Sequence, residues 1–151
     1  MKYPSYFTQD VCKVVDSLPT KELKKTITQL GAGMYHPLMN IIHENGRQVV
    51  ADEVFQCMNY ALTGMMIAFQ GDVNKTQSRT EQESILQDKM NNGGSFFNQM
   101  SVEVVSNFYD GFYDKLCDIE DPTKCVEFSV NTFVTISSGF MNVMIEEANN
   151  G

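Results

Sequence analysis

Four cysteines are the residues of this chain best suited to chemistry, and their spacing limits what that chemistry can be. They are Cys12, Cys57, Cys117 and Cys125. No two of them form a C-x-x-C pair, and the two histidines are far from them in sequence, so the pattern does not predict a zinc site. A disulfide could close the segment from Cys117 to Cys125 where two helices meet at a turn; the alternative is four buried free thiols.

The histidines and glycines do not form a catalytic or phosphate-binding pattern either. His36 and His43 are seven residues apart with Pro37 between them, and we interpret them as solvated side chains near a helix end. Gly31 and Gly33 lie within a helical repeat rather than in a loop after a strand, so we expect them to permit close helix packing. The sequence therefore predicts no enzyme activity, no metal and no cofactor.

Apolar residues recur every three or four positions along almost the whole chain, which is typical of amphipathic helices. One stripe steps through Leu23, Ile27, Leu30, Met34, Leu38 and Ile41, and another through Val50, Val54, Met58, Ala61, Met65 and Ala68. We expect helices near residues 7–18, 20–45, 49–69, 79–91, 97–117 and 122–148. The sequence thus predicts an all-α, five- or six-helix bundle.

Short sequence signals mark the ends of these helices. Pro19-Thr20 and Asp121-Pro122 are typical helix starts, and Asn45-Gly46 is a typical helix end. Pro37 should kink or split the helix in which it lies. The polar stretch that begins at residue 71 is the segment most typical of a loop.

Composition and charge narrow the classes of function. The chain has 151 residues, of which 42% are hydrophobic and 20% charged, as expected for one folded domain. Its net charge of −8 disfavours nucleic acid and anionic membranes as partners. No apolar stretch is long enough to cross a bilayer. The N-terminus lacks signal-peptide features, so we expect either an intracellular protein or a secreted one whose signal peptide has been removed.

Basic and acidic side chains are unevenly placed along the chain. Lys24 and Lys25 fall in the first turns of one expected helix, whereas Asp52 and Glu53 open the next, and the second half of the chain is acidic. A basic end and an acidic end on one surface favour antiparallel self-association, in which each positive end meets the partner's negative end. The alternative is a solvated face with no partner.

Four stretches of the chain together resemble a known family. They are Glu22 to Met34, the turn Asn45-Gly46-Arg47, and Met58 to Ala68, followed by Val104 to Met144. In order and pattern these resemble the N-terminal domain of spider silk proteins, the spidroins, a five-helix bundle with high Met content. The resemblance covers most of the chain, except for about twenty residues from 71 to 92 that look inserted.

The resemblance implies a domain of a secreted protein that forms an antiparallel homodimer on acidification. In the family an acidic pair on the second helix meets a basic residue at the start of the third helix of the partner. The matching positions here hold Lys24 and Lys25 on one side and Asp52 or Glu53 on the other, so the polarity is reversed. Of the family's titrating positions, only the region of Asp72 keeps an acid.

The resemblance also bears on the cysteines, because some spidroins join the first helix to the fourth by a disulfide, which would correspond to Cys12 and Cys117 here.

These observations lead to two hypotheses of different class. The first is a non-catalytic self-association module of a secreted silk-like structural protein, whose partner is a second copy of itself. The second is a small secreted helical carrier that holds a lipophilic ligand in an interior rich in Met and Phe, of which the chain has 10 each. A carrier would show a ligand cavity, whereas an association module would show a steep dependence of oligomeric state on pH and salt.

Overall fold

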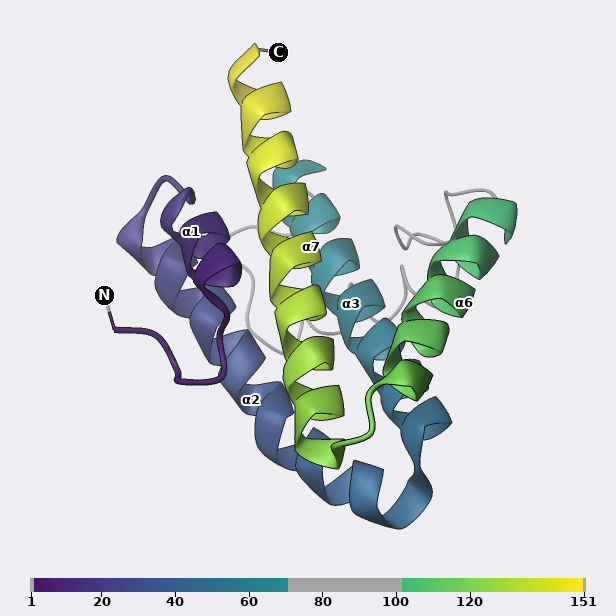
Figure 1. Cartoon of the computed structure of the whole chain (residues 1–151). Coiled ribbons are helices and arrows are strands. Elements are labelled where there is room, and N and C mark those ends of the chain that lie inside the picture. The colour runs from purple at the N-terminus through teal and green to yellow at the C-terminus, as the bar shows by residue number, and fades with distance from the viewer. Residues whose placement is uncertain (1, 71–101, 151) are drawn as a thin grey trace, which may run out of the picture.

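The protein is a bundle of α-helices, as the sequence predicts. The structure, a computed structural model, describes residues 2–70 and 102–150. Within them lie α1 (Gln9–Asp16), α2 (Lys21–Asn45), α3 (Arg47–Gln70), α6 (Val102–Asp118) and α7 (Pro122–Asn150), and no strand (Figure 1). The helix expected at 79–91, Asp72 and the segment 71–92 lie outside the described residues.

Side-chain and glycine caps account for the helix ends, largely where the sequence signals place them. The Oγ1 of Thr20 accepts a hydrogen bond from the Leu23 backbone N–H at 3.1 Å and so caps the start of α2. Gly46, with φ at +85°, ends α2 in a conformation that favours glycine, and α3 begins at the next residue. At the start of α7, Asp121 accepts from the Thr123 N–H at 2.9 Å. The boundaries predicted at Thr20, Gly46 and Pro122 are confirmed.

Pro37 does not divide α2, which runs unbroken from Lys21 to Asn45. Of the two outcomes expected at Pro37, a kink or a split, the split was therefore wrong. Pro37 lacks the N–H that would bond the carbonyl of Gly33 four residues earlier. Both residues lie on the exposed side of α2, where water can satisfy that carbonyl.

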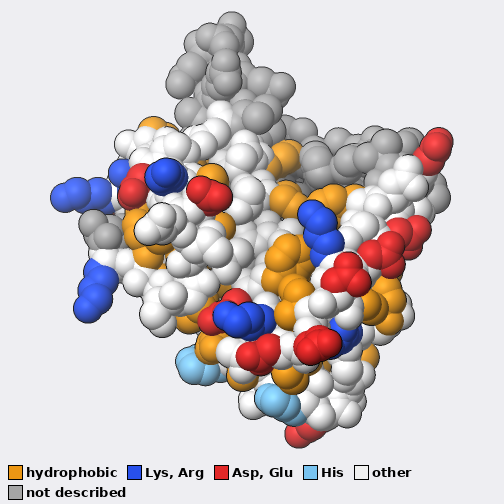
Figure 2. All heavy atoms as spheres, in the orientation of Figure 1, with side chains coloured by type: hydrophobic (Ala, Val, Ile, Leu, Met, Phe, Trp, Pro, Cys, Tyr) orange, Lys and Arg blue, Asp and Glu red, His pale blue; other side chains and the backbone are white. Residues whose placement is uncertain are grey.

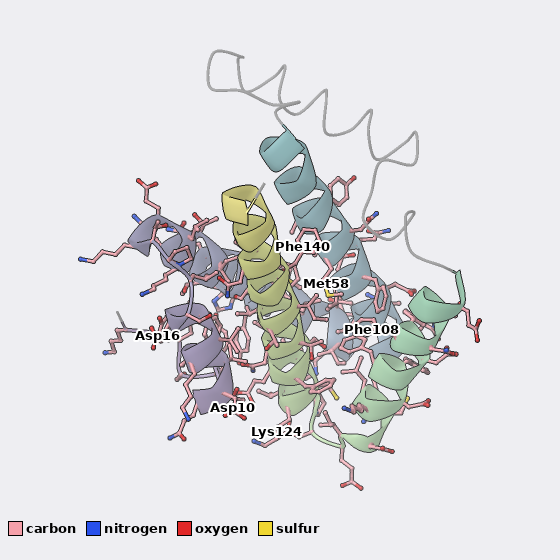
Figure 3. All side chains as sticks on the ribbon, turned by 90° about the horizontal axis from the view of Figure 1, so that it is seen from above. Asp10, Asp16, Met58, Phe108, Lys124 and Phe140 are labelled. Carbon is pink, nitrogen blue, oxygen red and sulfur yellow. The ribbon has the colours of Figure 1, made fainter. Side chains whose placement is uncertain are left out.

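The long helix α7 lies at the centre of the bundle and packs against α1, α2, α3 and α6 (Figure 1). Its side chains Val126, Val130 and Phe133 are at most 1% exposed. Met58 of α3 lies beside α7 in the middle of the molecule, also 1% exposed (Figure 3). The described helices thus share one hydrophobic core. None of them is long and apolar enough to cross a membrane.

Gly31 and Gly33 have different roles, although the sequence led us to expect close packing at both. A Cβ atom on Gly31 would lie 2.8 Å from Cγ2 of Val134 on α7 and 3.1 Å from the ring of Phe7. Gly31 therefore allows α2 to approach α7 closely, as predicted. A Cβ atom on Gly33 would meet nothing within 4 Å, so the expectation of close packing there was wrong.

The segment before α1 is held against α7 by one buried side chain. Asn131 accepts a hydrogen bond from the Thr8 N–H at 3.0 Å, and its Nδ2 donates to the carbonyl of Tyr6 at 2.9 Å. The ring of Tyr6 stacks on Tyr35 of α2 with centroids 4.1 Å apart. These contacts fix the N-terminal segment between α2 and α7.

Aromatic rings attach α6 to the rest of the bundle. The ring of Phe55 on α3 lies 5.4 Å from Phe108 and 4.8 Å from Tyr109, both on α6. Phe108 is labelled in Figure 3, where it lies between α6 and α3. Phe112 of α6 stacks on Phe128 of α7 with centroids 5.6 Å apart. This cluster sets the position of the acidic helix α6 relative to α3.

Candidate functional site

The charged residues expected at an interface lie at opposite ends of the α2–α3 pair. The two helices run in opposite directions from the turn at Gly46 (Figure 1). Measured from the turn, Lys25 lies twenty residues back along α2 from Asn45, which is about 30 Å of helix. Glu53 lies six residues along α3 from Arg47, which is about 9 Å. The two side chains are therefore about 20 Å apart along the helices. This exceeds the Debye length of about 8 Å at physiological salt, so the two ends act independently within one chain.

Asp52 is already engaged within the chain. The hydroxyl of Tyr109 on α6 donates to Oδ1 of Asp52 at 2.6 Å, and Nε2 of Gln48 donates to the same hydroxyl at 2.8 Å. Desolvation, followed by this hydrogen bond and the charge of Asp52, raises the pKa of Tyr109 to about 12. Asp52 therefore joins α3 to α6 instead of standing free for a partner.

Glu53 lies on a different face of α3. It is half-buried, one helical turn before Cys57, and Cys57 faces α2 across a groove. Burial, and then the charge of Glu53, raises the pKa of the Cys57 thiol. Adjacent carboxylates in the sequence are thus separated by the helix: Asp52 turns to α6 and Glu53 to the α2 side.

The two lysines differ in the same way. Lys25 is exposed on α2, whereas Lys24 is half-buried and its backbone carbonyl accepts from the Thr28 hydroxyl at 2.7 Å. On the face in Figure 2, lysines gather at the left over α1 and the start of α2, and carboxylates follow α6 at the right. The α6 carboxylates repeat at helical spacing and are exposed: Glu103, Asp110, Asp114 and Asp118.

All four cysteines are free thiols in this structure. Neither Cys12 with Cys117 nor Cys117 with Cys125 is joined by a disulfide. Cys117 is exposed at the end of α6, and its carbonyl accepts a hydrogen bond from the guanidinium of Arg47. Cys125 is buried near the start of α7, its Sγ is 3.4 Å from the Ile119 carbonyl oxygen, and burial raises the pKa of its thiol. The alternative of four buried free thiols was wrong in part, because only Cys125 is buried.

A groove of about 570 Å³ lies between α2 and α3, with α7 as its floor. Its apolar lining comes from all three helices: Leu30, Met34, Ala61, Phe133 and Met141. Leu30 is 39% exposed and Tyr60 of α3 is 44% exposed, so one large apolar side chain stands on each wall. Leu30 belongs to the apolar stripe of this helix but lies outside the core, because Gly31 takes the place facing α7.

Among the residues that the structure describes, the polar lining of the groove carries no formal charge. It consists of Thr26 and Gln29 on α2 with Cys57 and Tyr60 on α3. The nearest ionised residues on the same helices are Glu22, one turn before Thr26, Lys25, one turn before Gln29, and Glu53, one turn before Cys57. Sequence reasoning missed this groove. The one available signal was that Gly31 and Leu30 compete for a single core position.

The two histidines lie on the exposed side of α2, outside the groove. His36 and His43 are both exposed on α2, as expected for solvated residues. In the parts of the chain that the structure describes, no group of three or more His, Cys, Asp or Glu side chains could hold a metal ion. We base the functional hypotheses on the groove and on the charged ends of α2 and α3.

Comparison with known proteins does not place the chain in a family. No protein-family model, no curated protein and no solved structure matches it.

Proposed function

We propose that this chain is a non-catalytic self-association module of a secreted, silk-like structural protein, and that it forms an antiparallel homodimer through α2 and α3. The observation that carries the proposal is the placement of Lys25 and Glu53 at opposite ends of this helix pair, with the exposed Leu30 and Tyr60 between them. The helix order and the turn at Gly46-Arg47 also agree with the resemblance to spidroin N-terminal domains.

A two-fold axis across the middle of this face brings complementary surfaces together. In an isologous dimer each residue contact occurs twice, so the Lys25 end of each copy meets the Glu53 end of its partner. Leu30 and Tyr60 of both copies then lie in the centre, where their apolar surface is removed from water. An exposed ion pair contributes about 0.2–1 kcal/mol, so the charges set orientation while the apolar centre supplies much of the affinity.

Two electrostatic effects of acid oppose each other in this dimer. Protonation of Glu53 removes an attraction between the copies. Protonation of carboxylates elsewhere reduces the repulsion between two chains that each carry a net charge of −8. The second effect involves many of the 19 acidic residues and the first only one per copy, so we expect acid to favour association.

The direct test is sedimentation velocity at micromolar concentration, near pH 7.5, 5.5 and 4, at low and high salt, because carboxylates in general take up protons mainly below about pH 5. The expected result is conversion from monomer to dimer on acidification. A monomer under every condition would refute the proposal.

Charge-swap variants test the orientation. Lys25→Glu or Glu53→Lys replaces two attractions by two repulsions, a loss on the order of 1–2 kcal/mol, or roughly 5–30-fold in dimer Kd. The double variant Lys25→Glu with Glu53→Lys restores the attraction. Lys124→Glu is the matched control, because Lys124 is exposed at the start of α7 and points away from the bundle (Figure 3). Failure of the double variant to recover affinity would exclude this antiparallel arrangement.

A further inference from the structure

We propose that the groove between α2 and α3 binds an uncharged lipophile, a molecule with an alkyl or aryl body and at most one hydrogen-bonding group, such as a long-chain alcohol. This goes beyond self-association, because the described residues that line the groove all belong to one copy. It also revises the carrier hypothesis drawn from the sequence. The centre of the bundle is filled by side chains such as Phe133, Leu38 and Met58, each at most 1% exposed, and the space for a ligand lies in the open groove.

The shape of the groove suits a small molecule. Its volume of about 570 Å³ falls within the range of about 300–1,000 Å³ that is usual for small-molecule sites. Gly33 keeps the α2 wall open, since a Cβ atom there would have no neighbour within 4 Å. Met34 and Met141 are unbranched and polarisable, so they can adjust to ligands of different shape.

The charges around the groove select an uncharged ligand. No lysine, arginine or histidine is among the described residues that line it, so a carboxylate or phosphate would find no counter-ion there. Glu22 and Glu53, each one turn before a lining residue, would repel an anionic head group, and Lys25, one turn before Gln29, would repel a cationic one. Thr26, Gln29 and Tyr60 carry hydroxyl and amide groups that can bond one alcohol or amide group. Fatty acids and lipid phosphates are therefore disfavoured relative to alcohols of the same chain length.

Fluorescence titration with the neutral dye N-phenyl-1-naphthylamine tests the site, with dodecanol and dodecanoate as competitors. We expect dye binding that dodecanol displaces at least about tenfold more strongly than dodecanoate does. Gly33→Leu should fill the groove and weaken dye binding at least about tenfold. Gly139→Leu is the matched control, because Gly139 is an exposed helical glycine on α7 that lies outside the groove, and a Cβ atom there would also meet nothing within 4 Å.

Cys57 provides a second readout inside the groove. Dodecanol should slow maleimide alkylation of Cys57 but not of the exposed Cys117, and peptide mass mapping separates the two. The proposal is overturned if the dye does not bind, if Gly33→Leu binds it as well as the wild type, or if dodecanoate competes as well as dodecanol. Measurements at protein concentrations where the chain sediments as a monomer keep this result separate from self-association.

Discussion

Gly31 and Gly33, two residues apart on α2, provide a pair of alanine substitutions with opposite expected effects on stability. Alanine in place of a helical glycine usually stabilises a protein by about 0.5–1 kcal/mol, and this gain applies to both positions. At Gly33 the new Cβ meets no atom within 4 Å, so the full gain should appear in the free energy of unfolding.

At Gly31 the same gain is opposed by a steric clash. The new Cβ would lie 2.8 Å from Cγ2 of Val134 and 3.1 Å from the ring of Phe7, so α2, α7 or the N-terminal segment must shift. Overpacking of this kind costs about 1–3 kcal/mol, which leaves Gly31→Ala less stable than the wild type by up to about 2 kcal/mol. The stabilisation from replacing a helical glycine by alanine is common to both variants. The difference between their free energies of unfolding, about 1–3 kcal/mol, therefore measures the steric clash at Gly31 alone.

Urea unfolding followed by circular dichroism measures both free energies. For a chain of this size each kcal/mol also shifts Tm by roughly 2–4 °C, so thermal melts give an independent check. If Gly31→Ala were as stable as Gly33→Ala, α2 would not approach α7 as closely as described. The reasoning that places Leu30 in the groove would then fail with it.

Two further predictions concern the hydrogen bonds that attach other segments. Because the pKa of Tyr109 is raised to about 12 in the folded protein, its protonated hydroxyl stabilises the fold below about pH 10, and this contribution is lost as the pH rises through about 12. The variant Tyr109→Phe should lower the free energy of unfolding by about 1 kcal/mol and remove this part of its pH dependence. Urea unfolding of both proteins across that pH range measures the two effects. Asn131→Ala removes the hydrogen-bond partner of the Thr8 N–H and of the Tyr6 carbonyl. We expect the free energy of unfolding in urea to fall by about 2–3 kcal/mol and the backbone amides before α1 to exchange faster. Unchanged amide exchange in that segment would contradict this prediction.

The helical architecture could be predicted from the sequence because its signals are local. Threonine and aspartate caps satisfy backbone N–H groups within three residues, and Gly46 ends α2 through its own backbone conformation. Some predictions were wrong where the outcome depended on how one helix packs against another. Pro37 would divide many helices, but here it lies on the exposed side of a helix whose other side packs on α7.

The groove could not be predicted because it depends on which of two neighbouring residues faces α7. Periodicity alone places Leu30 in the core, since it lies three residues after Ile27 and four before Met34. The tight approach of Val134 to Gly31 decides the question in favour of the glycine, and the helix rotation that follows turns Leu30 outward. This information lies in the contact between two helices and is absent from either stripe read separately.

The same reasoning separates the two acidic residues at the start of α3. From the sequence, Asp52 and Glu53 are equivalent candidates for an intermolecular ion pair. Successive helix positions differ by about 100°, so α6, by packing on one side of α3, takes Asp52 into the Tyr109 hydrogen bond and leaves Glu53 beside the groove. Asp52→Asn should accordingly disturb the attachment of α6 while leaving dimer affinity nearly unchanged. Glu53→Gln should do the reverse, and equal effects of the two on sedimentation would contradict this division of roles.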